Sequence, residues 1–158
     1  MSVQIFLQAK LLGIEEFLAA PAPAGIEGSD AEALFIGRSQ WVTLLAEVLP
    51  RALLAELGLA RILLGTSGGG QFLVVLPEVA RGEGHEFLAA AGAGIRRMSA
   101  GRLRLVWALT ENLGDWSDVR KRLTEEMRRL RGAPAAESGA ETFEPADTRE
   151  AEAGEFFM

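Results

Sequence analysis

Two short apolar runs separated by glycines stand near the middle of the chain. The runs are Ile62–Leu64 and Phe72–Leu76, and residues 65–71 between them read GTSGGGQ. Buried strands that flank a short glycine-containing turn are typical of a β-hairpin. Three consecutive glycines, Gly68–Gly70, remove every Cβ at the predicted tip, so another backbone or a flat ligand could come close to it. The local pattern fits an ordinary hairpin turn in a core sheet equally well.

Other segments show strand or helix periodicity on either side of this hairpin. Alternating apolar residues predict strands over Val3–Ala9 and Leu103–Leu109. Apolar residues at helical spacing predict four helices, over about residues 14–18, 38–57, 83–98 and 116–131. The last of these should bury one apolar stripe, made of Trp116, Val119, Leu123, Met127 and Leu130. The second helix should begin near Gly37 or Arg38 and should kink or split at Pro50. Residues 21–32 are rich in proline and glycine and predict a long loop.

The predicted element order is β-α-α-β-β-α-β-α. The two hairpin strands must be antiparallel, whereas strands connected through helices can cross over in parallel. This order predicts an α+β, ferredoxin-like fold in which a sheet of about four strands, antiparallel or mixed, carries helices on one face. Many unrelated proteins share this arrangement, so the fold class alone does not specify a function.

Composition and charge divide the chain into a body and a tail. The 158 residues suit one domain over residues 1–131. Residues 132–158 carry seven acidic residues and one arginine, which accounts for the whole net charge of −6 and predicts a mostly disordered acidic tail. The chain has no cysteine, no membrane-length apolar run and no secretory signal, so we expect a cytoplasmic protein without thiolate metal sites.

Three motifs, together with the last predicted strand and helix, allow a more specific interpretation. They are GI-x-x-F at residues 13–17, GRS at residues 37–39 followed by Trp41, and GGGQF at residues 68–72. In this order and spacing, the body from about Val3 to Arg131 resembles the first palm domain of the large subunit of type III CRISPR effector complexes. That subunit is a polymerase- and cyclase-like protein related to the GGDEF cyclases.

The resemblance implies a supporting role. In that family two palms face each other, and the second bears a GGDD hairpin that makes cyclic oligoadenylates from ATP when target RNA is bound. The first palm has a GGG-type hairpin without the acidic pair. The resemblance thus implies a non-catalytic palm that supports a catalytic partner palm in antiviral defence, with ATP held at a shared palm–palm site. The nucleotide-binding residues it implies are Ser67, Gly68, Gly69, Gly70, Arg38 and Ser39.

The candidate residues also have plainer interpretations. Arg38 and Ser39, at a predicted helix start, suit either a phosphate contact or a helix cap. Ser67 suits either a ligand contact or an ordinary turn. Lys10 stands where the family often has an aspartate, and a solvated lysine is the simpler interpretation. His85, in an exposed stretch with no evident partner, is expected to be an ordinary surface histidine.

Catalysis by this chain alone is not expected. Nucleotidyl transfer by a palm requires carboxylates that hold divalent ions, and the predicted tip has none, so we expect neither a metal nor an enzyme. Glu15 and Glu16 form a solvated helix face rather than a catalytic pair.

An assembly role is the alternative function. The chain would then contact other type III effector subunits or guide–target RNA without binding nucleotide. The basic cluster Arg120–Arg131 suits a solvated helix face or, less often, an RNA or subunit contact. Pairing of two copies through their glycine hairpins is a further expectation for partners.

Overall fold

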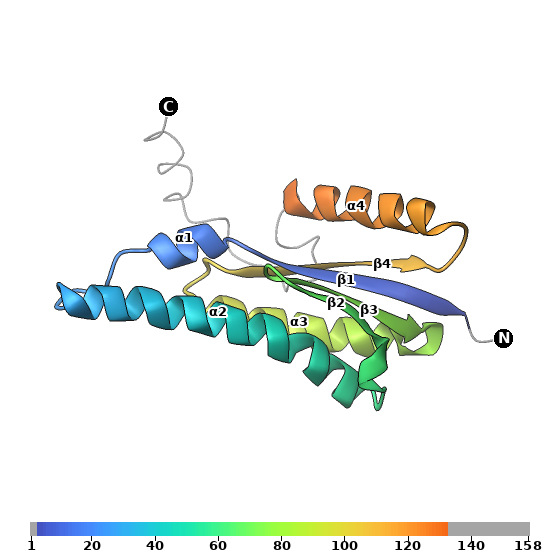
Figure 1. Ribbon diagram of the computed structural model, residues 1–158, viewed down its shortest axis with the longest axis horizontal. Coiled ribbons are helices and arrows are strands. Elements are labelled where there is room, and N and C mark those ends of the chain that lie inside the picture. The colour runs from blue at the N-terminus through green and yellow to red at the C-terminus, as the bar shows by residue number, and fades with distance from the viewer. Residues whose placement is uncertain (1–2, 133–158) are drawn as a thin grey trace.

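The central strand of the protein has apolar side chains on both of its faces. In β1 (Gln4–Leu12), Ile5 and Leu7 point to one face, whereas Phe6 and Leu12 point to the other. A strand with two apolar faces must be covered on both sides. The computed structural model describes residues 3–132 and shows β1 in the middle of the molecule, with helices above and below the sheet (Figure 1).

The sheet has four strands in the order β2-β3-β1-β4, and every neighbouring pair is antiparallel. Leu7 of β1 lies opposite Val74 of β3 on one side and Leu109 of β4 on the other. The ferredoxin-like α+β fold class is confirmed, and the crossover strands pair antiparallel rather than parallel. The partner strands are β2 (Leu64–Gly68), β3 (Gln71–Pro77) and β4 (Arg104–Glu111).

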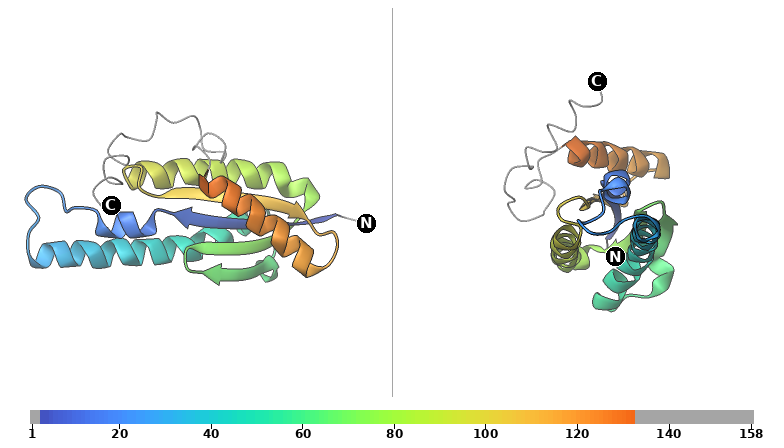
Figure 2. Two further views of the ribbon diagram at one scale, coloured as in Figure 1. Left: turned by 90° about the horizontal axis from the view of Figure 1, so that it is seen from above. Right: turned by 90° about the vertical axis from the view of Figure 1, so that its left-hand side faces the viewer.

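Two separate apolar clusters hold the helices on the sheet. The larger one joins Ile5, Leu7 and their neighbours to α2 (Ser29–Glu56) and α3 (Arg81–Met98). The smaller one joins Phe6, Leu12 and Leu73 to α4 (Trp116–Gly132), which therefore lies on the opposite face, as Figure 2 also shows. The expectation of helices on one face thus fits α2 and α3, but α4 covers part of the other face.

The long helix α2 differs from its prediction in two ways. It begins at Ser29 rather than near Gly37 or Arg38, and it runs without interruption through Pro50. A proline has no N–H to donate to the carbonyl four residues earlier, which here belongs to Ala46. The hydroxyl of Ser67 on β2 donates a hydrogen bond to this Ala46 oxygen at 3.4 Å. A side chain from the sheet thus replaces the bond that Pro50 cannot make.

The first hairpin strand was also predicted in the wrong place. Ile62 lies in a 3-10 turn, η1 (Arg61–Leu63), and 89% of its surface is exposed. Strand β2 instead includes residues expected in the turn, because Ser67 and Gly68 pair with Phe72 and Gln71 of β3. Strand pairing uses backbone groups, so it does not require apolar side chains.

The remaining elements are short. Helix α1 (Ile14–Ala19) follows β1 directly, as predicted, and a second 3-10 turn, η2 (Glu78–Ala80), precedes α3. Trp116, expected in the buried stripe of the last helix, is 51% exposed and contacts Phe6 with ring centroids 5.3 Å apart. No helix within residues 3–132 is long and apolar enough to cross a bilayer. Nearly all of the predicted tail lies outside the described residues.

Candidate functional site

The tip of the β2–β3 hairpin is open on one side. Gly68 and Gln71 form the last strand pair, so only Gly69 and Gly70 make the turn. A Cβ added to Gly68 or Gly69 would have no atom within 4 Å. The backbone at these two residues is therefore bare and approachable, as the sequence predicted.

The other side of the tip is closed by the corner between β1 and α1. The Leu11 amide donates a hydrogen bond to the Gly70 carbonyl oxygen at 2.7 Å. Gly70 has a φ of 75°, and a Cβ there would lie 2.6 Å from Cδ1 of Ile14. Only glycine fits this close approach, so Gly70 fixes the tip against the first residue of α1.

Ser67 contacts helix α2 rather than open space. Its bond to the Ala46 carbonyl completes the helix beside Pro50. Its strand partner, Phe72, belongs to the larger apolar cluster beneath α2 and α3. The geometry thus gives Ser67 a role in the fold, on the opposite side of the sheet from α4.

Arg38 and Ser39 do not lie at a helix start. They are the tenth and eleventh residues of α2, where backbone N–H groups are already used by the helix. The Arg38 guanidinium donates hydrogen bonds to the carbonyl oxygens of Ala20 at 2.6 Å and Pro21 at 3.4 Å. It also stacks 5.5 Å from the centre of the Phe17 ring. Arg38 therefore holds the end of α1 against α2.

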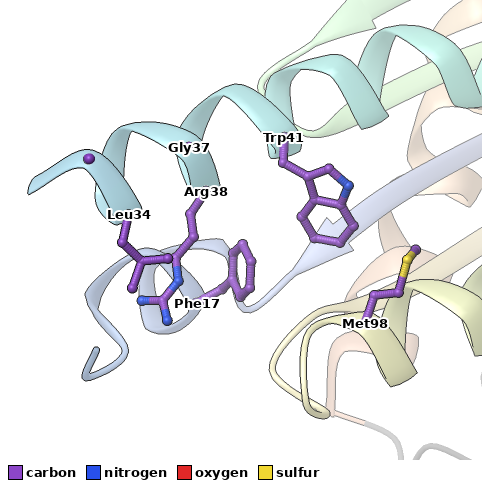
Figure 3. Close-up of a pocket in the computed structure, with 7 residues that line it drawn as sticks. Phe17, Leu34, Gly37, Arg38, Trp41 and Met98 are labelled. Atoms are coloured by element: carbon purple, nitrogen blue, oxygen red, sulfur yellow. The ribbon is translucent and has the colours of Figure 1, made fainter. Parts of the chain in front are cut away.

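A hollow of about 350 Å³ adjoins this contact (Figure 3). Figure 3 shows Phe17 and Trp41 on one side and Met98, from the end of α3, across from them. The Phe17 and Trp41 rings lie 5.5 Å apart. The lining is apolar except for Arg38, whose donors already bind carbonyl oxygens. The hollow therefore suits an apolar group better than a phosphate.

The predicted nucleotide site is thus divided. Arg38 precedes Ala46, the contact of Ser67, by eight residues, which corresponds to about 12 Å along the axis of α2. The glycine tip lies at one end of α1 and Arg38 at the other. The structure brings Ser67 and the three glycines together on one hairpin but does not bring Arg38 and Ser39 to it.

Lys10 is part of β1 and lies beside the glycine hairpin. Its register partners are Gln71 on β3 and Val106 on β4, and it is half-buried. Within residues 3–132, no group of three histidine, cysteine, aspartate or glutamate side chains could hold a metal ion. The hairpin corner is thus lined by an amine, an amide and bare backbone. Glu15 and Glu16 are exposed on α1, as predicted.

A second hollow, of about 390 Å³, lies between β4, the start of α4 and Arg81. Arg81 forms a bidentate pair with Glu78, with N–O distances of 2.7 and 2.9 Å. This hydrogen bonding lowers the pKa of the Glu78 carboxyl and raises that of the Arg81 guanidinium. The other arginine of the lining, Arg122, binds backbone oxygens of the β4–α4 turn. Both guanidinium groups therefore already have partners.

His85 has a partner that the sequence did not indicate. The indole N–H of Trp107 donates a hydrogen bond to Nδ1 of His85 at 3.2 Å, and the two rings meet edge to face at 5.3 Å. This bond fastens α3 to β4. No nucleophile takes part in it, so the contact is structural.

Sequence reasoning missed how α4 packs on the sheet. The signal was the pair Phe6 and Leu12, which give β1 a second apolar face that needs a cover. Helix α4 fills that place and leaves Lys10 and Gln71 beside it, on the side of the glycine tip. Helix α4, with its basic residues, therefore lies on the same side of the sheet as Lys10.

No family model matches the chain, and no curated protein matches it in sequence. Solved structures do match. The first is the Csm1–Csm4 cassette in complex with cA3, with 20% identity and a TM-score of 0.67 over 82% of this chain and 19% of that one. Another is Csm1 from T. onnurineus, with 20% identity and a TM-score of 0.65 over 84% of this chain and 20% of that one.

The chain has the fold of one part of Csm1. A third match, the Csm1–Csm4 subcomplex of the type III-A CRISPR-Csm interference complex, has a TM-score of 0.67 at 20% identity, over 82% of this chain and 19% of that one. This chain spans about a fifth of the length of the chains that it matches. At this level of identity, the likeness establishes the shared fold.

Proposed function

We propose that this chain is a non-catalytic palm domain of a type III CRISPR effector large subunit. In this proposal it supports ATP binding and cyclic oligoadenylate synthesis by a partner palm that carries a GGDD hairpin. The observation that carries the proposal is the bare hairpin tip, where a Cβ added to Gly68 or Gly69 would meet no atom within 4 Å. A ribose or base can lie directly against such a backbone.

The comparisons support this choice of ligand and partner. Csm1, whose fold this chain shares in part, has been crystallised with Csm4 in complex with AMPPNP, cA3 and cA4. For this chain, the partner palm would supply the carboxylates and metal ions of the reaction, and the glycine tip would supply a surface without side chains. Lys10, an amine beside the tip, suits a phosphate and repels a metal ion.

The test adds one side chain to the open tip. Asparagine tolerates the left-handed backbone of Gly69, whose φ is 60°, better than other residues do. We expect Gly69→Asn to keep the fold and to weaken ATP binding to the complex of this chain with a GGDD palm at least tenfold, measured by calorimetry.

The matched control is Gly58→Asn. Gly58 has a φ of 64° and open space around it, but it lies at the end of α2. If both variants bind ATP as the unchanged chain does, the tip plays no part in nucleotide binding. If no GGDD palm associates with the chain, the proposed function itself is wrong.

Assembly without nucleotide is the second candidate. Helix α2 exposes four large apolar residues, with 47–58% of each surface in solvent: Phe35, Ile36, Leu44 and Val48. Leu44 and Val48 lie one turn apart on the same side of the helix, and exposed apolar neighbours of this kind suit a protein interface. In this case the same calorimetry would detect association with effector subunits that ATP and Gly69→Asn leave unchanged.

A further inference from the structure

Helix α4 has two chemically different flanks beside its buried stripe of Val119, Leu123, Met127 and Leu130. Successive residues are 100° apart on a helix, which places two exposed cations on one flank of the stripe, Arg120 and Arg131, and two more next to them on the side that faces solvent, Arg128 and Lys121. These four cations are named here the basic row. The other flank carries Asp118, Glu126, Arg122 and Arg129.

The orientation of α4 follows from the contacts of Arg122. Its guanidinium donates to Thr110 Oγ1 at 3.0 Å and to the carbonyl oxygens of Glu111 at 3.1 Å and Leu113 at 2.7 Å. These acceptors lie at the end of the edge strand β4 and in the turn after it. Arg120, two residues earlier, lies about 160° away around the helix and so faces the opposite way, toward β1 and β3.

Part of the sheet beside the basic row is accessible to solvent. Leu73 of β3 packs against the cluster under α4, which places β3 next to that helix. Viewed from above, α4 crosses the sheet diagonally and leaves the glycine end of the β2–β3 hairpin beside it rather than beneath it (Figure 2). On this part of the sheet Gln71 is exposed and Gln8 and Lys10 are half-buried, and these three residues are named here the floor.

This floor carries no negative charge. Lys10 alternates with the odd-numbered residues of β1 that face α2 and α3, so it shares the α4 face with Gln8 and, by register, with Gln71. No residue of β1, β2 or β3 is an aspartate or glutamate. The face thus combines an amine and two amides with the cations of α4.

The cations of the basic row are available for an external anion. Within residues 3–132, none of the four forms an ion pair, although Glu125 lies one turn from Lys121 and Arg128. The row extends over twelve residues, from Arg120 to Arg131, or about 16 Å of helix. A single phosphate needs one or two such groups, whereas a line of four suits anions that repeat along a chain.

We propose that the basic row and the adjoining floor with Lys10 bind the phosphodiester backbone of a single-stranded nucleic acid. Half-exposed Trp116, over Phe6 at the start of α4, provides one ring on which a base can stack. The remaining contacts address phosphate, so binding depends strongly on salt and little on sequence. This surface lies on one chain and requires no partner palm, so it extends beyond the proposed function.

The test is a salt titration of binding to a fluorescent oligouridylate of about ten nucleotides. The full chain is used, so the acidic residues after Gly132 are present in every arm. With four phosphate contacts, the slope of log K against log salt is expected near −3, from about −0.7 per contact on single strands. Arg120→Gln/Arg128→Gln/Arg131→Gln should bring the slope near −1 and weaken binding at least tenfold at low salt.

The control removes the same number of charges elsewhere, as Arg51→Gln/Arg61→Gln/Arg97→Gln. These exposed arginines lie on α2, η1 and α3, and the control should bind nearly as the unchanged chain does. Equal losses in both triple variants would show diffuse attraction and overturn the proposal. Competition by ATP at the same strength as by the oligonucleotide would assign the site to free triphosphate, and tighter binding of a duplex would exclude a single-strand site.

Discussion

The two halves of the predicted nucleotide site differ in whether their polar groups are still available. At the glycine tip the backbone of Gly68 and Gly69 is bare and open. At the other end of α1, the guanidinium of Arg38 is bound to two carbonyl oxygens and stacked on Phe17. A motif rich in polar residues can therefore be structural, while a motif without side chains remains open to a ligand.

The comparison also explains why these motifs occur together. The three motifs, at residues 13–17, 37–39 and 68–72, all contact or form the six-residue helix α1. Gly70 packs on Ile14 at its start, and Arg38 binds Ala20 and Pro21 just after its end. A helix this short has little stability of its own and depends on its neighbours. The three motifs therefore occur together because they hold α1 in place at both of its ends. Only the glycine tip of the hairpin remains a candidate for ligand binding.

The largest expected effect is at Gly70. Gly70→Ala combines an unfavourable positive φ with a Cβ only 2.6 Å from Cδ1 of Ile14. We expect the free energy of unfolding to fall by about 2–4 kcal/mol in urea denaturation. Ile14→Val removes Cδ1, so it should return about half of the loss in the double variant. Gly69→Ala is the comparison, because Gly69 also has a positive φ but has open space around it. If the two variants lost the same unfolding free energy, the close contact between Gly70 and Ile14 would be contradicted.

Arg38 should contribute to stability and not to binding. Arg38→Met keeps the aliphatic stem but removes both hydrogen bonds and the ring contact, which should cost about 1–2 kcal/mol of unfolding free energy. Arg97→Met, on an exposed part of α3, is the control. ATP binding to the complex with a GGDD palm should change less than twofold. If Arg38→Met weakened ATP binding tenfold and left the free energy of unfolding unchanged, Arg38 would be a nucleotide-binding residue after all.

The smallest expected effect concerns Ser67. Ser67→Ala should cost about 0.5–1 kcal/mol in thermal or urea unfolding, because the Ala46 carbonyl loses its donor. In a Pro50→Ala background, the amide of residue 50 can donate to that carbonyl, so the same change should cost less. Thr43→Ala, whose hydroxyl bonds to Ser39 of the same helix, should show no such coupling. If Ser67→Ala costs the same unfolding free energy in both backgrounds, the Ser67 hydroxyl does not replace the hydrogen bond that Pro50 lacks.

Periodicity predicted the fold because most elements bury one clear stripe. It located α3 within two residues and the apolar stripe of α4 from Val119 to Leu130. It failed where an element buries no regular apolar stripe. Strand β2 forms through backbone pairing, and the first turns of α2 leave Phe35 half-exposed. The open glycines could be found because a missing Cβ is visible in a sequence. The partners of Arg38 could not, since they are carbonyl groups placed by the tertiary fold.

Phe35 shows what the early start of α2 means for the shape of the molecule. It lies seven and fourteen residues before Val42 and Leu49, both buried, and so shares their side of the helix. In Figure 1 this end of α2 extends past the sheet. The apolar side of α2 that packs on the sheet thus continues into solvent at Phe35. A neighbouring subunit that bound there would extend the existing apolar core and would not need a separate interface.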